Sequence, residues 1–280
     1  MTKDLVKTDG AKLSIFWDGP KWGGRATASF GEVAFKSLEA GTEVLTRAIE
    51  MVKNAGLTHV VGPMDGDTWH SYRFVSESDG SPAFLMEPKD APVAREVFQA
   101  AGFEPIGRYF SARQSLCDIG TAPPESGAFR IETWDGNDPE ALFMQVFELS
   151  VQAFENNAFY KPISPEDFLA MYMPIVPMLK KDLIFFARRP EGELAGFLFA
   201  IPDYAQGPES DTVILKTYAS LLRGAGRGLV QACQTSAKTL GYKNLIHALI
   251  HDSNQSAERS EKEGGQIFRR YELLGLRLSD

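Results

Sequence analysis

Three glycines, at positions 224, 226 and 228, separate a strand-like segment from a helix-like segment. Residues 211–220 (DTVILKTYAS) have the β-branched and aromatic content of a strand, and apolar residues then recur at helical spacing up to Gly241. Glycines let the backbone approach a ligand closely, and the N-terminus of a helix carries partial positive charge. The order strand, glycine turn, helix therefore predicts a phosphate-binding turn, with the charges of Arg223 and Arg227 beside it.

Two common nucleotide-binding patterns do not fit this turn. A dinucleotide-binding turn has an acidic residue about 20 positions downstream, at the end of the next strand, and residues 244–251 offer none. A P-loop needs Lys-Ser or Lys-Thr after the glycines, which is absent. An ordinary glycine-rich turn remains the alternative. The pattern that fits is Arg-x-x-Gly-x-Gly, met by Arg223, Gly226 and Gly228, and it resembles the acetyl-coenzyme A (acetyl-CoA) loop of the GNAT acetyltransferase superfamily.

The surrounding segments strengthen this resemblance. Helix-capping signals stand at Asp138-Pro139 and at Ser164-Pro165, and residues 190–192 (PEG) mark a hairpin. The expected order from residue 129 is β-α-α-β-β-β-α-β-α-β, with strands at 129–133, 182–188, 193–201, 211–220, 244–251 and 267–278. This order is similar to that of a GNAT domain over residues 129–280.

An internal repeat explains the amino-terminal half. An offset of 185 places Gly241 on Gly56 and Gly226 on Gly41. The repeat predicts a helix over 43–56, a strand over 59–62, a last helix over 91–103 and a final strand over 105–113. Residues 12–17 and 25–35 already look like strands, so the two opening helices are missing. The expected fold class is α/β with a mixed sheet: two GNAT-like domains in tandem, an incomplete one over 1–122 and a complete one over 123–280.

The first-half turn lacks the features of a phosphate site. Leu38 stands where Arg223 stands, and Glu43 occupies the place of Gly228. A carboxylate at a helix N-terminus interacts with the positive end and repels phosphate. We therefore expect coenzyme in the second half only, with the first half as a scaffold or as one wall of the acceptor site. Residues 62–73 also resemble a signature of a bacterial family of tandem GNAT proteins.

Composition limits the classes of partner. The net charge of −8 argues against nucleic acid and leans toward an amine acceptor. No apolar run is long enough for a membrane span, and the first residues do not look like a signal peptide. Cys117 and Cys233 are the two cysteines, so neither a disulfide framework nor a cysteine-rich metal cluster is expected. These features predict a cytoplasmic protein, monomeric or homodimeric, without a bound metal.

The resemblance implies which residues contact acetyl-CoA. The pyrophosphate would be held by Arg223 and by the turn that follows it, which consists of Gly224, Ala225, Gly226, Arg227, Gly228 and Leu229. The main chain of Tyr218 would contact the pantetheine and the thioester. Asn254 matches the start of an Asn-x-x-Ala-x-x-x-Tyr pattern in which the Tyr usually protonates the leaving thiolate. Glu261 stands at that Tyr position, so Tyr271 becomes the candidate acid, with Ser253 and Ser260 as alternatives.

Candidates for the base and the acceptor pocket are less specific. His247 and His251 lie four apart on one strand, where they would serve as base or bond across the sheet. Residues 154–162 place Phe159 and Tyr160 near the carboxylate of Glu155, which suits an amine with an apolar body, although the aromatic residues also fit a core. Tyr72 and Arg73 form a second substrate candidate, in which Arg73 would pair with a substrate carboxylate or with a surface acid.

These observations predict an N-acetyltransferase that moves an acetyl group from acetyl-CoA to the amine of a small molecule. A non-catalytic acyl-CoA sensor is the first alternative, motivated by the missing Tyr. An aminoacyl-tRNA-dependent enzyme that forms peptide bonds is the second, but the acidic charge and the complete Arg-x-x-Gly-x-Gly turn count against it.

Overall fold

The strands of both halves form one continuous sheet. The computed structural model describes residues 2–117, 119 and 128–278. Its strand order is β1-β2-β3-β4-β12-β6-β11-β10-β9-β8-β7, with β5 added beside β12. The strands are β1 Lys3–Thr8, β2 Ala11–Phe16, β3 Ala28–Phe35, β4 His59–Gly62, β5 Phe74–Ser78, β6 Glu104–Ser115, β7 Arg130–Thr133, β8 Ile184–Arg188, β9 Leu194–Pro202, β10 Thr212–Ser220, β11 Asn244–His251 and β12 Gln266–Arg277.

The helices follow the predicted order. They are α1 Leu38–Asn54, α2 Pro92–Ala100, α3 Pro139–Phe154, α4 Pro165–Tyr172, α5 Ala225–Thr239 and α6 Gln255–Lys262, with 3-10 turns at Met173–Met178, Lys181–Leu183 and Tyr204–Gln206. Asp138 and Ser164 cap α3 and α4 by accepting the N–H groups of Ala141 and Asp167. The β-α-α-β-β-β-α-β-α-β order of the second half is confirmed, and no helix precedes α1 among the described residues of the first half.

The internal repeat is confirmed by the strand register. In the first half, Ala28 pairs with Val60 where β3 and β4 run parallel. In the second half, Val213 pairs with Leu245 where β10 and β11 run parallel, and both residues lie 185 positions further along the chain. Each half therefore contains the same unit: a parallel strand pair joined by a helix, α1 or α5.

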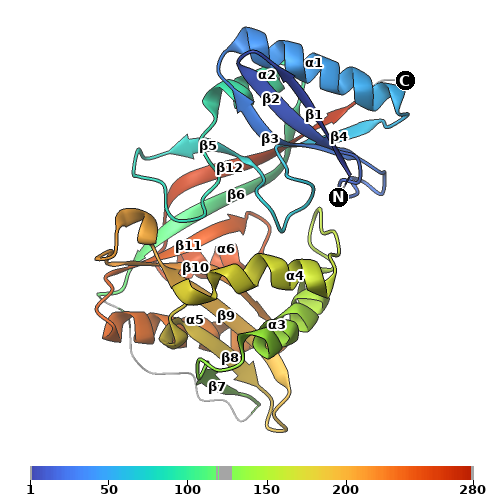
Figure 1. Ribbon diagram of the computed structural model, residues 1–280. Coiled ribbons are helices and arrows are strands. Elements are labelled where there is room, and N and C mark those ends of the chain that lie inside the picture. The colour runs from blue at the N-terminus through green and yellow to red at the C-terminus, as the bar shows by residue number, and fades with distance from the viewer. Residues whose placement is uncertain (1, 118, 120–127, 279–280) are drawn as a thin grey trace.

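The two halves exchange their last strands. β6 ends the first half, yet it lies between β12 and the second-half strand β11. β12 ends the chain, yet it pairs with the first-half strand β4. In Figure 1 these two long strands cross the middle of the molecule and connect the upper and lower parts. The division at residue 122 stays a prediction, but each half needs the other half's final strand to continue its sheet.

Helices cover both faces of the second-half sheet. α5 packs its apolar stripe on one face, against β8, β9 and β10, while α3 and α4 pack Phe143 and Phe168 against Phe186 and Phe199 on the other. Cys233 of α5 is buried in the first of these cores, where burial raises the pKa of its thiol to about 12. Within the described residues, none of the helices has the length and hydropathy needed to cross a bilayer.

Candidate active site

The two parallel strands of the second half separate partway along their length. β10 and β11 pair only from Thr212 with Asn244 to Leu215 with His247, although both strands continue beyond these residues. Each strand has an irregularity where the pairing ends. β10 bulges at Lys216, and β11 bulges after His247, with Leu249 at a φ of 57°. Bulges bend a strand and interrupt its pairing, so together they open a cleft between β10 and β11.

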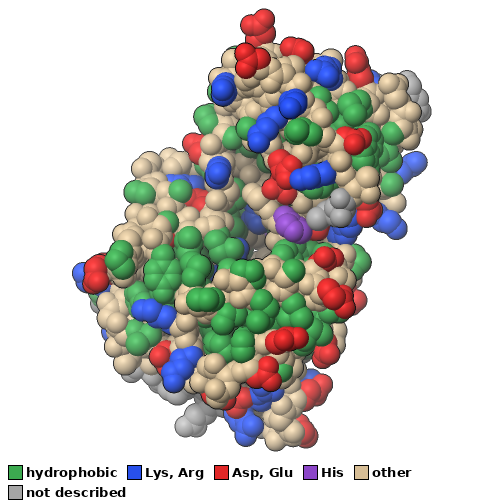
Figure 2. Space-filling model, in the orientation of Figure 1, with side chains coloured by type: hydrophobic (Ala, Val, Ile, Leu, Met, Phe, Trp, Pro, Cys, Tyr) green, Lys and Arg blue, Asp and Glu red, His purple; other side chains and the backbone are tan. Residues whose placement is uncertain are grey.

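A cavity of about 460 Å³ occupies this cleft. The second half contributes residues 215–218 of β10, residues 247–251 of β11, part of α6, residues 156–158 and Tyr160. The first half contributes Thr68, Trp69, Tyr72, Arg73 and Tyr109. Trp69 Nε1 donates to the Lys161 carbonyl at 2.9 Å, which fixes the two halves against each other at the cavity rim. Figure 2 shows the recess between the two parts of the molecule.

The glycine turn has the geometry of an anion-binding turn. Gly224 precedes α5 with a φ of 89°, a left-handed conformation that favours glycine. The N–H groups of Arg223, Gly224 and Gly226 have no acceptor among the described residues, and the guanidinium groups of Arg223 and Arg227 form no ion pair there. Ala225 and Leu229 bury their side chains in the core, so their main chain alone faces this turn.

The main chain of Tyr218 points toward the cleft. Leu221 N donates to Ala195 O, and hydrogen bonding alternates between neighbouring pairs of an antiparallel ladder. By this alternation, the main chains of Thr217 and Ala219 hydrogen-bond to β9. The N–H of Tyr218 points to the opposite side of β10, where the pairing with β11 has already ended. An unpaired N–H at this position can donate to a carbonyl oxygen in the cleft.

The sequence did not single out Arg259, which lies beside this end of the cavity. Its Nη1 donates to the Tyr218 hydroxyl at 3.1 Å, and a Cβ added at Gly226 would be 3.1 Å from the same nitrogen. Asn254 stands at the N-cap of α6 and lines the cavity, and its contact with a ligand stays a prediction. The turn, Tyr218, Asn254 and Arg259 thus lie along one side of the cleft.

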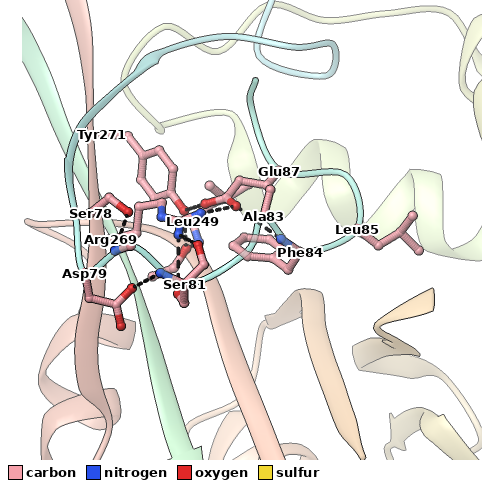
Figure 3. A network of polar contacts seen from close by, with 12 residues as sticks. Ser78, Asp79, Ser81, Ala83, Phe84, Leu85, Glu87, Leu249, Arg269 and Tyr271 are labelled. Atoms are coloured by element: carbon pink, nitrogen blue, oxygen red, sulfur yellow. Dashed lines mark hydrogen bonds and ion pairs between the residues drawn. The ribbon is translucent and has the colours of Figure 1, made fainter. Parts of the chain in front are cut away.

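Tyr271 lies outside the cavity, which removes the geometric basis for the direct acid role predicted for it. The residue is fully buried on β12, where its hydroxyl donates to Glu87 and bonds to Ser111 at 3.0 Å. Burial raises the pKa of the hydroxyl well above its usual range. Figure 3 shows this hydroxyl and Arg269 both directed at Glu87. Sequence spacing could not reveal this, because the partner, Glu87, lies 184 positions away.

His247 and Glu155 also differ from their predicted catalytic roles. Nε2–H of His247 donates to Gln114 at 3.1 Å, and Nδ1 accepts from Ser260 at 2.8 Å, because the amide oxygen of Gln114 can only accept. Burial lowers the pKa of His247 to about 4, so it is neutral and structural, the alternative that its sequence context left open. Glu155 is exposed at the end of α3 and does not line the cavity, so the structure does not support it as a base.

The substrate candidates divide into two groups. Tyr72, Arg73 and Tyr160 line the cavity, which brings together residues from both predicted clusters. Phe159 does not line it and packs instead on a core that contains Tyr109 and Tyr271. Ser253, the alternative acid, lines the cavity and hydrogen-bonds to His251 Nδ1 at 2.8 Å.

Lys216 is a second cavity residue that the sequence analysis missed, after Arg259. It is the one charged residue inside the apolar run of β10, and that isolated charge was the available signal. Its side chain forms no hydrogen bond or ion pair among the described residues. Desolvation and the nearby charge of Arg73 lower the pKa of its ammonium to about 8.

Solved structures of GNAT proteins resemble this chain over most of its length. A GCN5-related N-acetyltransferase from Sphaerobacter thermophilus superposes with a TM-score of 0.60 over 97% of this chain and 78% of that chain, at 13% sequence identity. A tandem GNAT protein from the clavulanic acid biosynthesis pathway gives a TM-score of 0.56 over 96% and 79%, also at 13% identity. The chain has a GNAT fold.

A third similar structure is longer than this chain. It is a probable N-acyltransferase from Enterococcus faecalis V583, with a TM-score of 0.58 over 95% of this chain and 58% of that one, at 8% identity. No protein-family model and no curated protein sequence matches the chain. The GNAT resemblance read from the Arg-x-x-Gly-x-Gly turn and the element order is therefore confirmed by structure, at the level of the fold.

Proposed function

We propose that this protein is an acyl-CoA-dependent N-acyltransferase that acetylates the amine of a small molecule. The observation that carries the proposal is the cleft between β10 and β11, where N–H groups of the glycine turn have no acceptor among the described residues and the Tyr218 N–H faces away from the ladder with β9. The turn would hold the pyrophosphate of coenzyme A, with Arg223 and Arg227 beside it. The Tyr218 N–H would donate to the thioester carbonyl oxygen.

Acetyl-CoA would supply the activated acyl group, and this chain would orient the two reactants and exclude water. The acceptor would enter from the side formed by both halves, between Trp69, Tyr72 and Tyr160. Three aromatic side chains around a polar cavity suit an amine with an apolar body. An amine attacks only as the free base, so the rate is expected to rise with pH through the pKa of the acceptor.

The test is the release of free thiol from acetyl-CoA in the presence of a panel of small amines. We expect amine-dependent release, with the acetylated product identified by mass spectrometry. A non-catalytic acyl-CoA-binding module is the second candidate, favoured by the positions of Tyr271 and Glu155 outside the cavity. Tight coenzyme binding without thiol release for any amine would favour that module over the transferase.

A further inference from the structure

Three cationic side chains line the cavity, and none forms an ion pair with a carboxylate among the described residues: Arg259, which donates to the Tyr218 hydroxyl, Arg73 and Lys216. Arg73 is 7% exposed, and its guanidinium makes one hydrogen bond, from Nη1 to the Leu249 carbonyl at 3.1 Å. Its Nε is buried without a partner, and Lys216 lacks both hydrogen bonds and ion pairs within the described residues. Buried charges in proteins are normally paired. Arg73 is buried and Lys216 is half-buried, so a counter-charge that the described residues do not provide would stabilise both cations.

Arg269 shows how the same chain treats a buried arginine that has a structural role. Its Nη1 lies 2.6 Å from a Glu87 oxygen, and both side chains are almost completely buried. Figure 3 shows that carboxylate between Arg269 and Tyr271. Within the part of the chain that the structure describes, Arg73 has no carboxylate in the place that Glu87 takes beside Arg269, although it is buried to a similar degree.

The local structure holds Arg73 in place. The guanidinium carbon lies 3.8 Å from the ring centre of Tyr72 and 4.2 Å from that of Tyr109. Arg73 has a φ of 78°, and Leu249, whose carbonyl it contacts, has a φ of 57°. Positive φ values are costly for residues other than glycine, and they persist where the surrounding structure enforces them, commonly at functional sites. The side chain is therefore positioned before any ligand arrives.

The charge of Arg73 affects the pKa of three residues of the cavity, Lys216, His251 and Tyr109. Desolvation is the largest cause of the lowered pKa of Lys216 and of His251, and the charge of Arg73 lowers both further. Glu263 is the single carboxylate among the described lining residues, and it accepts a hydrogen bond from Gln234 at 2.9 Å. The Arg73 side of the cavity therefore carries net positive charge.

We propose that Arg73 and Lys216 form a carboxylate-binding subsite, so that one of the two reactants carries a carboxylate. The carboxylate belongs to the amine acceptor, as in an amino acid, or to the far end of a dicarboxylic acyl group, as in succinyl-CoA. This inference rests on the proposed acyltransferase function. Charge-assisted hydrogen bonds to guanidinium and ammonium groups, made in a site with little water, would select the anionic reactant.

Two matched pairs of substrates distinguish the two sources. Phenylalanine and phenethylamine, each with acetyl-CoA, differ by the acceptor carboxylate. Succinyl-CoA and butyryl-CoA, each with phenethylamine, differ by the acyl carboxylate. We expect a preference of roughly 10- to 100-fold in kcat/KM for the anionic member of one pair. That pair identifies the reactant with the carboxylate, and the absence of a preference in both pairs overturns the subsite.

Variants test whether these residues cause the preference. Arg73→Met and Lys216→Met should each bring the ratio within the preferred pair close to one. Arg113→Met is the matched control, because Arg113 also stacks on an aromatic ring, 4.5 Å from Phe268, but lies outside the cavity. A preference that survives both cavity variants contradicts the proposal, and Lys216→Met keeps the test valid if Arg73→Met does not fold.

A binding measurement separates failure of the subsite from failure of the transferase function. Succinate is titrated into the protein while NMR follows the pH titration of the Lys216 side chain, whose pKa is about 8 without an anion. A bound carboxylate should raise that pKa, because it stabilises the ammonium form. If no amine is acylated but the pKa rises, the subsite stands and the transferase fails. An unchanged pKa at saturating succinate overturns the subsite.

Discussion

The two halves share a parallel strand pair and a helix, and they differ in what lies between the strands. In the first half the chain fills its own cleft after β4. Met64 N donates to Phe30 O at 2.7 Å, and Glu32 N donates to the Asp65 carboxylate at 2.6 Å. In the second half the equivalent edge of β10 faces the cavity. One sequence repeat therefore provides a closed scaffold and an open site.

The helix starts differ in the same way. Ser37 caps α1 by accepting the Ala40 N–H at 3.2 Å. Gly41 packs so tightly that an added Cβ would be 2.6 Å from the Phe35 ring. At α5 the cap is Gly224, which has no side chain to occupy the turn. A phosphate-binding turn needs free N–H groups, so the side-chain cap of α1 and the glycine cap of α5 are suited to different roles.

The largest expected effect comes from closing the open half. Gly226→Asp would place a carboxylate beside Arg259 Nη1, where it competes with an anionic ligand and repels phosphate. We expect coenzyme A affinity, measured by calorimetry, to fall at least ~100-fold, which is about 2.7 kcal/mol. Thr239→Asp is the control, since it adds the same charge at the exposed far end of α5. Unchanged affinity in a folded Gly226→Asp variant would remove the turn from the binding site.

The second prediction weakens the closed half. Asp65→Ala removes the acceptor of the Glu32 N–H and should lower the free energy of unfolding by roughly 1–3 kcal/mol. Denaturant titration measures that loss. Asp135→Ala is the matched control, because its exposed carboxylate also accepts a backbone N–H, from Asn137 at 2.8 Å. Coenzyme stoichiometry should stay at one per chain in both variants, and a second site would contradict the closed-cleft interpretation.

The third prediction concerns His247, which lies in the open cleft where the first half has Gly62. Burial lowers the pKa of His247 to about 4, so its contribution to stability is present above the unfolded pKa of about 6.5 and is lost as the pH falls toward 4. Between pH 7 and pH 5.5 this loss is about 1 kcal/mol. His247→Gln should remove that part of the pH dependence of unfolding.

His70 provides a control of opposite sign. The hydrogen bond to Asp67 raises its pKa, so its contribution is present below the unfolded pKa and is lost as the pH rises through the folded pKa. His70→Gln should therefore cost stability on the acidic side. An identical pH dependence in the wild type and in His247→Gln would show that His247 is not buried in its neutral form.

The smallest effect is expected for the exposed arginines of the turn. Arg223→Ala and Arg227→Ala should each weaken coenzyme A binding by roughly two- to fivefold, because exposed charges are well screened. The loss should diminish as salt is added, when binding is measured between low and high ionic strength. A large, salt-independent loss would mean that these side chains enter the site on binding. Arg47→Ala in the middle of α1 should leave binding unchanged.

The local elements and their repetition can be predicted from the sequence. Capping residues at Asp138 and Ser164, the glycines of the turn and the 185-residue offset depend on neighbouring positions or on self-similarity, and both can be read along the chain. The same reasoning gave Tyr218, Asn254, Tyr72, Arg73 and Tyr160, which line the cavity, and the turn, whose Gly226 lies beside Tyr218 and Arg259. The fold resemblance followed from the order of these elements.

The neighbours of each element depend on contacts that exist only in the folded molecule. Strand propensity predicts β6 and β12 but not that each pairs with the other half, because partner choice depends on contacts distant in the sequence. The sequence makes Tyr271 a candidate acid, and only the fold shows that its hydroxyl is buried against Glu87. Likewise, Lys216 is one charge in a strand by sequence, and only the fold shows that it lies at a bulge and lines the cavity. Burial and the proximity of charges set the chemistry of a side chain, and both are properties of the folded molecule.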